Sequence, residues 1–302
     1  MRLEGCMTAL VTPFTGSEVD YEGLRSNIRF QIENGISGIV PLGTTGESPT
    51  IEEGERQRIV KVSVEEASGK AKVIVGTGTN STKSTIEHTL MAQDAGADAV
   101  LIVAPYYNKP SQEGLYRHFE AVSKVAHIPI ILYNIAGRTG VNIEVKTLLR
   151  LSDVSNIVGV KEASGNMAQI MEILSRMPET FSVLSGDDSL TLPMISAGAR
   201  GVISVASNLL PKKVAALVEQ AGLGNNDHAR EINSNLSPIF KALFIETNPV
   251  PVKTAMNLCG MPAGPVRLPL VKLSEENLQF LKSVIRNYHE LRISDRRAIR
   301  LG

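Results

Sequence analysis

Two side chains with the chemistry for covalent catalysis, Lys161 and Tyr133, each end an apolar run. Lys161 follows residues 157–160, and Tyr133 follows residues 130–132. An amine at the end of such a run can hold an anion as a fixed cation, attack a carbonyl carbon once it is neutral, or extend into solvent. If the two runs are neighbouring strands, the phenol lies near the amine and can move protons during imine chemistry. The pair therefore indicates either anion binding or imine formation.

Further hydroxyl groups and a guanidinium group follow other apolar runs. Residues 43–48, Gly-Thr-Thr-Gly-Glu-Ser, offer backbone N–H groups and the hydroxyls of Thr44 and Thr45, which suit a carboxylate or a phosphate. The segment lacks the lysine of a P-loop, so it does not predict nucleotide binding. Thr44 and Tyr107 are candidates for the second hydroxyl that a phenol-based proton relay needs. Arg138 lies in a predicted loop, where it can clamp a carboxylate or remain a solvated charge.

Other polar residues predict neither a metal site nor a disulfide framework. Cys6 and Cys259 are the two cysteines of the chain, a number typical of proteins from a reducing compartment. Asp187 and Asp188 can bind a cation, but Asp188 directly before a helical stretch is better explained as a helix N-cap. The five histidines lack the spacing of metal ligands; they are His88, His118, His127, His228 and His289.

Eight short runs rich in Val and Ile alternate with longer amphipathic stretches. The first begins near residue 8 and the eighth near residue 201, which leaves about 28 residues for each strand, its helix and their connections. Runs that are apolar on both faces are typical of parallel strands covered on both sides. The predicted strands are residues 8–12, 38–42, 72–76, 99–104, 130–134, 157–161, 181–185 and 201–204. Eight such units predict a (β/α)8 barrel, with a doubly wound sheet as the alternative.

From residue 226 onward the pattern changes to helical periods without strands. We therefore expect residues 1–225 to form the barrel that carries the active site, and residues 226–302 to form a C-terminal helical extension. Active sites of this fold lie at the carboxyl ends of the strands, which is where the candidate residues fall. Predicted helix starts are Asp20, the capping-box pattern from Thr50 to Glu53, and Ser274.

Charge and composition exclude several classes of protein. The 302 residues carry 31 basic and 31 acidic side chains, so the chain lacks the basic excess that nucleic acids or anionic membranes require. Hydrophobic residues make up 43%, too many for a disordered chain. No apolar run approaches the roughly 18 residues of a membrane-spanning helix, and Glu4 and Thr8 interrupt any signal-peptide core. We expect a cytoplasmic protein whose partners are small-molecule substrates.

Five segments occur in a fixed order along the chain, and together they carry a resemblance. They are Gly43-Thr44-Thr45-Gly46-Glu47-Ser48, Pro105-Tyr106-Tyr107-Asn108-Lys109-Pro110, Tyr133-Asn134 with Arg138-Thr139-Gly140, Gly159-Val160-Lys161-Glu162-Ala163, and Glu246-Thr247-Asn248-Pro249-Val250-Pro251-Val252-Lys253. As a set they closely resemble the dihydrodipicolinate synthase family of pyruvate-dependent class I aldolases, which includes N-acetylneuraminate lyase. The resemblance runs nearly end to end, including the helical extension.

The resemblance implies a lyase reaction. In this family the lysine that ends the sixth barrel strand forms a Schiff base with pyruvate, which gives that role to Lys161. The enamine attacks the aldehyde of L-aspartate 4-semialdehyde, and cyclisation yields 4-hydroxy-tetrahydrodipicolinate on the route to diaminopimelate and lysine. The family is typically a homotetramer, and its chemistry implies no metal and no organic cofactor.

The resemblance also implies roles for the other candidates. Tyr133, Thr44 and Tyr107 match the family's proton relay, with Tyr107 reaching in from a neighbouring subunit. Thr45 matches the contact to the pyruvate carboxylate, and Arg138 matches the carboxylate contact at the site entrance. The backbone positions near the lysine correspond to Gly186 and Ile203.

One departure from the family's pattern lies before Arg138. The family usually has a Pro in this segment, whereas Ala136-Gly137 leaves the backbone freer here.

Two other functions are alternatives. A sister aldolase acting on a 2-keto-3-deoxy sugar acid or sialic acid is the nearer alternative, although such lyases generally lack this arginine. A non-catalytic barrel that binds a keto acid is the second, although a binding protein needs no proton relay.

Feedback inhibition by lysine is a further expectation from the resemblance. In lysine-inhibited members the effector binds at a subunit interface. Its lining positions match Ser48, Pro49, Glu53, Arg56, Asn80, Ser84 and Tyr106. Sensitive enzymes commonly have a His where this chain has Arg56 and a Glu where it has Ser84. Ser84 cannot neutralise the ligand's ammonium group and Arg56 adds a like charge, so we expect weak or absent inhibition.

Overall fold

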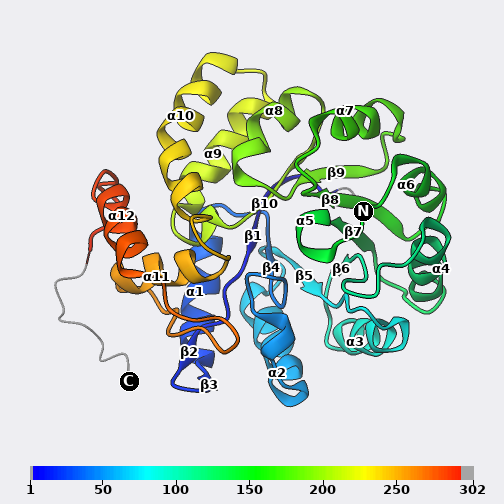
Figure 1. Ribbon diagram of the computed structural model, residues 1–302, viewed down its shortest axis with the longest axis horizontal. Coiled ribbons are helices and arrows are strands. Elements are labelled where there is room, and N and C mark those ends of the chain that lie inside the picture. Colours follow the sequence, from blue (N-terminus) through cyan, green and yellow to red (C-terminus); the bar gives the residue numbers. More distant parts are fainter. Residues whose placement is uncertain (1–2, 294–302) are drawn as a thin grey trace.

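A closed barrel of eight parallel strands forms the centre of the computed structural model, which describes residues 3–293 (Figure 1). The first strand pairs with both the second and the last strand of the barrel, which closes the sheet. The predicted (β/α)8 barrel is therefore confirmed. In chain order its strands are β1 (Gly5–Ala9), β4 (Gly38–Val40), β5 (Lys72–Gly76), β6 (Ala99–Val103), β7 (Ile130–Asn134), β8 (Ile157–Glu162), β9 (Ser182–Ser185) and β10 (Gly201–Ser204).

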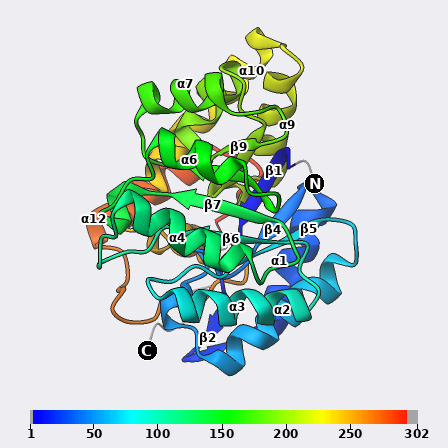
Figure 2. The ribbon, with the colours of Figure 1, turned by 90° about the vertical axis from the view of Figure 1, so that its right-hand side faces the viewer.

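Helices between the strands form the outer layer of the barrel, and Figure 2 shows four of them, α3, α4, α6 and α7, side by side. Alternate strand residues face opposite sides. Leu101 and Ile131 belong to the cluster inside the barrel, whereas Ile102 and Leu132 pack between strands and helices. The helices of this layer are α1 (Tyr21–Glu33), α2 (Glu53–Ala67), α3 (Thr82–Asp94), α4 (Gln112–Ser123), α6 (Val145–Ser152), α7 (Met167–Arg176), α8 (Thr191–Ser196) and α9 (Pro211–Gly222).

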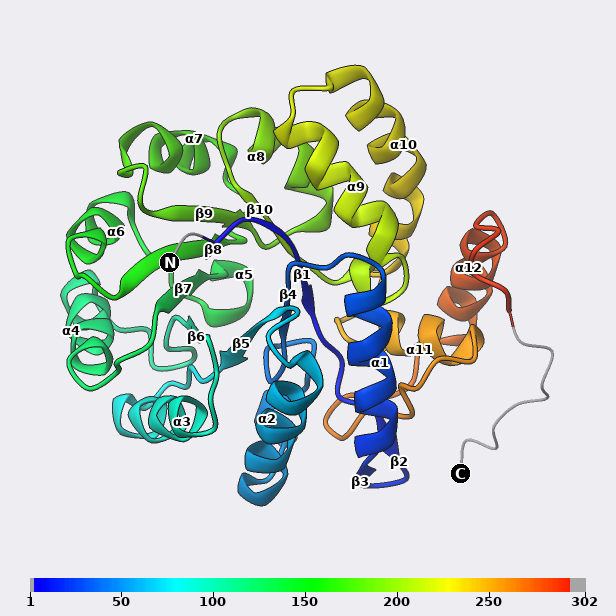
Figure 3. The same ribbon diagram turned by 180° about the vertical axis from the view of Figure 1, so that it is seen from behind.

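Three helices follow the barrel and lie along one side of it: α10 (Asn226–Ala242), α11 (Val250–Leu258) and α12 (Glu275–Ile285) (Figures 1 and 3). Leu236 and Leu281 pack in the same apolar cluster as residues of the barrel interior. The end of the predicted extension, residues 294–302, lies outside the described residues, and the domain division at residue 225 stays a prediction. Among residues 3–293, no helix has the length and apolarity needed to cross a membrane.

The first strand and a small hairpin differ from the sequence prediction. The first strand was predicted at residues 8–12, but β1 spans Gly5–Ala9, and the buried residues 10–12 lie beyond its end. The hairpin β2 (Phe14–Thr15) and β3 (Glu18–Val19) follows and was not predicted. Strands of two residues are too short to show an alternating pattern, so the sequence holds no periodic signal for them.

Two predicted helix starts are wrong and two are confirmed. Helix α2 begins after Glu52, whose side chain forms the capping box with Glu55, because Thr50 already belongs to the 3-10 turn η1 (Ser48–Thr50). Asp187, not Asp188, caps the 3-10 turn η2 (Asp188–Leu190). The Asp188 carboxylate is buried and instead accepts the backbone N–H groups of residues 205 and 206. The confirmed N-caps are Asp20 of α1 and Ser274 of α12.

Candidate active site

Lys161 and Tyr133 lie side by side at the carboxyl ends of neighbouring strands. They are register partners in the β7–β8 pair, and each residue is 5% exposed. The Lys161 Nζ lies 4.3 Å from the centroid of the Tyr133 ring. The predicted adjacency of amine and phenol is thus confirmed. An amine this close to a phenol, at the mouth of a barrel, can react with a small carbonyl compound while the phenol exchanges protons.

Gly186, directly after β9, borders the side chain of Lys161. A Cβ added at Gly186 would lie 3.0 Å from Lys161 Cε and 2.7 Å from Ala163 Cβ, so only glycine allows this close packing. Ile203 is buried in the apolar interior, opposite Met7 of β1 in the ladder. Gly186 therefore gives the stem of Lys161 the room that it occupies, while Ile203 belongs to the apolar interior of the barrel.

A bond on the opposite face of the same two strands fixes their ends. Asn134 and Glu162, the residues after Tyr133 and Lys161, are fully buried, and Asn134 Nδ2 donates to Glu162 Oε2 at 2.9 Å. The other carboxylate oxygen of Glu162 accepts the Ser164 N–H at 2.7 Å. These bonds hold the amine and the phenol in register. Sequence reasoning missed them, although an amide and an acid at paired strand positions were a usable signal.

The loop after β4 presents two hydroxyls, and a residue from the turn between α10 and α11 supports one of them. Thr45 is 3% exposed, and its Oγ1 accepts a hydrogen bond from Asn248 Nδ2 at 3.0 Å. Thr44 is half-buried in the same loop. The Glu47 N–H donates to the Thr44 carbonyl at 3.1 Å, which closes the loop on itself. Asn248 lies 203 residues from Thr45, so sequence reasoning did not assign it to the site.

Arg138 stands at the exposed rim of this arrangement. It belongs to the single turn α5 (Ala136–Thr139), which ends at Gly140 with a φ of +74°. Ala136-Gly137 is therefore a helical turn here and not an extended loop. The Arg138 Nη2 donates to the Asn248 carbonyl at 3.1 Å, so Asn248 contacts both the predicted rim arginine and Thr45.

The structure does not bring Tyr107 into the buried cluster of its own chain. The residue is 88% exposed and has a φ of +73°, an uncommon conformation for a side chain of this size. It follows Pro105 and Tyr106 in the loop after β6. A phenol held out into solvent in this way cannot pack beside Tyr133, which is buried.

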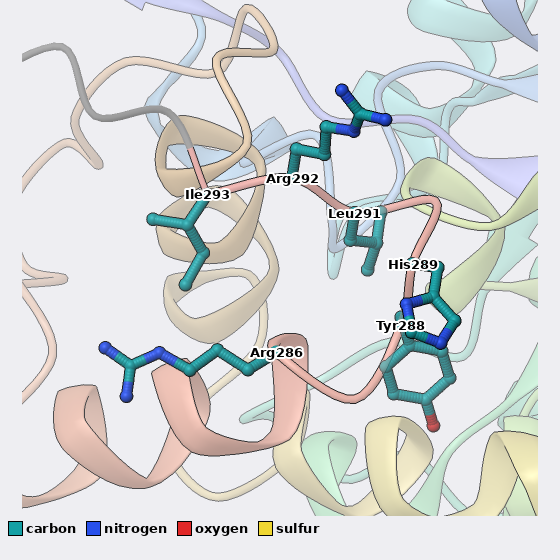
Figure 4. A pocket seen from close by; sticks show the side chains of 6 residues that line it. All are labelled: Arg286, Tyr288, His289, Leu291, Arg292 and Ile293. Atoms are coloured by element: carbon teal, nitrogen blue, oxygen red, sulfur yellow. The ribbon is translucent and has the colours of Figure 1, made fainter.

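A hollow of about 440 Å³ lies elsewhere on the surface and contains none of the candidate site residues (Figure 4). It lies in the segment after α12, and no candidate catalytic residue lines it. Its lining residues are Arg286, Tyr288, His289, Leu291, Arg292 and Ile293. Across residues 3–293, no group of three or more His, Cys, Asp or Glu side chains is arranged to hold a metal ion.

Comparison with known proteins gives one consistent family. The sequence model of the dihydrodipicolinate synthetase family matches residues 2–288. The 4-hydroxy-tetrahydrodipicolinate synthase of Protochlamydia amoebophila is 51% identical over 289 residues, which cover 94% of this chain and 96% of that protein. The enzyme of the same name from Methanocaldococcus jannaschii is 49% identical and covers 94% of this chain and 98% of its own length.

Solved structures agree with these sequence relatives. Dihydrodipicolinate synthase from Aquifex aeolicus superposes with a TM-score of 0.94 at 49% identity, over 96% of this chain and 99% of that one. A structure described as the first monomeric dihydrodipicolinate synthase variant superposes with a TM-score of 0.93 at 44% identity, over 94% of this chain and 96% of that one. Similarity at this level extends over the barrel and the C-terminal helices alike.

Proposed function

The chain belongs to the dihydrodipicolinate synthetase family, and we infer from this membership that it is a lyase of the 4-hydroxy-tetrahydrodipicolinate synthase type. It condenses pyruvate with L-aspartate 4-semialdehyde to give 4-hydroxy-tetrahydrodipicolinate, a step in diaminopimelate and lysine biosynthesis. The observation that carries this conclusion is identity near 50% over almost the full length of enzymes with this name. A coupled assay that pairs pyruvate with aspartate semialdehyde or with sugar-derived aldehydes tests it, because a sugar-acid aldolase would prefer the second class.

We propose that Lys161 is the nucleophile of this reaction. Its neutral amine attacks the carbonyl carbon of pyruvate, and loss of water from the carbinolamine gives an imine. Tyr133 and Thr44 pass protons to the leaving hydroxyl and from the methyl carbon, which produces the enamine. The support for these roles is the buried position of the amine beside the phenol, with the loop of Thr44 at the same end of the barrel.

The hydroxyl and N–H groups around Thr45 are proposed to hold the pyruvate carboxylate. Thr45 is buried and its hydroxyl oxygen already accepts a bond from Asn248, so its own proton is free to point toward an anion. A carboxylate held in this loop would place the adjacent carbonyl carbon toward the barrel axis. Gly186 and Ile203 would then border the pyruvate from the far side of the lysine.

Replacing Arg138 with Ala should impair use of aspartate semialdehyde far more than imine formation, because only the second carboxylate loses its partner. Losing a charge-assisted pair at a bound carboxylate should cost about 2–5 kcal/mol in kcat/KM for the aldehyde. Steady-state kinetics and borohydride trapping of pyruvate measure the two steps separately. Arg138→Lys, which keeps the charge but not the two-pronged geometry, should be intermediate. Equal losses in both steps would mean that Arg138 acts mainly by holding Asn248.

Tyr107 is proposed to complete the proton relay of a neighbouring subunit. Its exposed phenol and strained backbone fit a side chain that projects from its own chain to meet another. A homotetramer is the proposed assembly, although one relative of known structure is described as a monomeric variant. We also propose that the enzyme works in the cytoplasm, where pyruvate is available and where two unpaired cysteines remain reduced.

L-lysine should inhibit this enzyme weakly or not at all. Arg56 is 6% exposed, and its guanidinium donates to the Ser48 hydroxyl at 3.2 Å and to the Ser48 carbonyl at 3.0 Å. Glu53 Oε2 lies 3.4 Å from His88 Nε2 and 3.9 Å from Arg56 Nε. The acid is therefore already engaged, and Ser84 brings no charge to pair with a lysine ammonium group.

Initial rates at saturating pyruvate and rising L-lysine measure the inhibition. Strong inhibition below millimolar lysine would contradict it, and Ser84→Glu should increase sensitivity if the charge argument holds.

A further inference from the structure

A buried ion pair links the loop of Thr44 and Thr45 to the C-terminal helices. Glu47 Oε1 and Lys253 Nζ are 2.7 Å apart, and each side chain is 1% exposed. Lys253 Nζ also donates to the Thr12 carbonyl at 2.9 Å. The second carboxylate oxygen of Glu47 accepts the backbone N–H of Arg267 at 2.9 Å. The pair therefore joins the loop of Glu47 and helix α11 to two further segments of the chain, at Thr12 and at Arg267.

The pair is not explained as a simple source of stability. Burial lowers the pKa of Lys253 from its usual value of 10.5 to about 8, even with the Glu47 carboxylate beside it. Glu47 itself has a φ of +55°, a conformation that L-residues rarely adopt. Apolar residues of similar volume often replace buried ion pairs with no loss of stability. Net folding stability alone therefore does not account for the pair.

The position of the pair in the chain indicates a role in placing the loop of Thr44 and Thr45. Glu47 is two residues beyond Thr45, and Lys253 is on α11, the helix that directly follows Asn248 and Pro249. The same two segments meet a second time where Asn248 Nδ2 donates to Thr45 Oγ1. The loop's internal bonds, such as Gly46 N–H to the Gly43 carbonyl, set its shape but not its placement against α11. Together the two bridges restrict pivoting of the loop about either contact.

We propose that Glu47 and Lys253 form a positioning pair for catalysis, which holds the loop of residues 43–48 against α11 so that Thr44 and Thr45 face the imine-forming lysine. This inference rests on the proposed roles of Thr44 and Thr45. It gives the C-terminal helices a part in the reaction, since Lys253 acts through the loop and not on the substrate. Thr12 adds to the clamp, because its hydroxyl donates to the Gly46 carbonyl at 2.8 Å while its own carbonyl accepts from Lys253.

Three variants test the positioning role. Lys253→Met removes the ammonium group but keeps an apolar stem, and it leaves the Glu47 carboxylate buried and unpaired. The double variant Glu47→Gln/Lys253→Met removes both charges. The matched control is Glu66→Gln, which removes the charge of Glu66 of α2 from its 2.7 Å pairs with Arg25 and Arg29 of α1, outside the loop of residues 43–48. For each variant, the melting temperature is measured together with kcat and KM for pyruvate.

Lys253→Met should lower kcat/KM for pyruvate by about 10- to 100-fold, the effect expected of a misplacement near 1 Å, with KM raised through Thr45 and kcat lowered through Thr44. The double variant should regain melting temperature, because no buried charge is left unpaired, and yet keep the kinetic defect. Glu66→Gln should lose melting temperature without a change in KM. Kinetics that recover together with stability, a double variant that does not fold, or a control with the same rise in KM would each overturn the positioning role.

Borohydride trapping of pyruvate on the unmodified enzyme separates this inference from the proposed function. If the unmodified enzyme traps no pyruvate, the proposed mechanism fails and the positioning role fails with it. If it traps pyruvate normally and Lys253→Met has unchanged kinetics, only the positioning role is wrong.

Discussion

Lys161→Ala is expected to abolish condensation, with a loss in kcat on the order of 10⁵- to 10⁶-fold, comparable to the removal of a catalytic nucleophile in other covalent mechanisms. The loss is large because binding alone cannot provide the enamine: without the imine, the methyl group of pyruvate has no electron sink. Bound pyruvate should still reach the loop of Thr44 and Thr45, so its affinity should change much less than the rate. Stopped assays with excess enzyme will detect the residual activity.

Mass analysis identifies the lysine directly. Treatment with pyruvate and borohydride should leave a reduced adduct on the peptide that contains Lys161 and on no other lysine peptide. The control is Lys146→Ala, on the exposed face of α6, which should be labelled as fully as the unmodified enzyme. Label on another lysine, including the buried Lys253, would refute the assignment of Lys161.

The part of the site that lies on consecutive strands could be predicted from the sequence. In a parallel barrel each strand pairs with the next, and side chains alternate between interior and exterior. Two residues that end neighbouring strands on the inner face must then meet. The irregularity in the β7–β8 ladder falls between Ile130 and Ile131, before the site, so it did not disturb the pairing of Tyr133 with Lys161.

The contacts from the C-terminal helices could not be predicted in the same way. Asn248 lies 203 residues from Thr45 and Lys253 lies 206 residues from Glu47, and no rule of strand order connects these segments. Their meeting depends on the path of the chain after α10. Glu47 also carries a conformation with positive φ that sequence reasoning assigns first to glycine. Periodicity therefore located the neighbouring pair of Tyr133 and Lys161, whereas the elements that fix the loop became visible only in the fold.

The role of Tyr107 comes from the family resemblance. Its exposed position leads to a prediction about how subunits share an active site. Tyr107→Phe alone should lower kcat by about 10²- to 10⁴-fold, the usual contribution of a positioned acid–base group. Lys161→Ala alone should be inactive. If the phenol acts in the site of a neighbouring subunit, oligomers mixed from these two variants should regain activity, because a subunit with an intact lysine can receive an intact phenol from its partner. With equal amounts and random exchange, about a quarter of the sites would be complete.

The matched control replaces Tyr107→Phe by Tyr133→Phe in the same mixing experiment. Tyr133 and Lys161 are paired strand residues of one chain, so no exchange of subunits can restore both to one site. Activity should therefore return for the first mixture and not for the second. Subunit exchange is verified by native mass spectrometry of an isotope-labelled partner before the rates are compared. If exchange is complete and neither mixture recovers, Tyr107 acts within its own subunit or outside catalysis. Since 88% of the residue is exposed in the isolated chain, the first of these would require the loop after β6 to fold back over the barrel mouth.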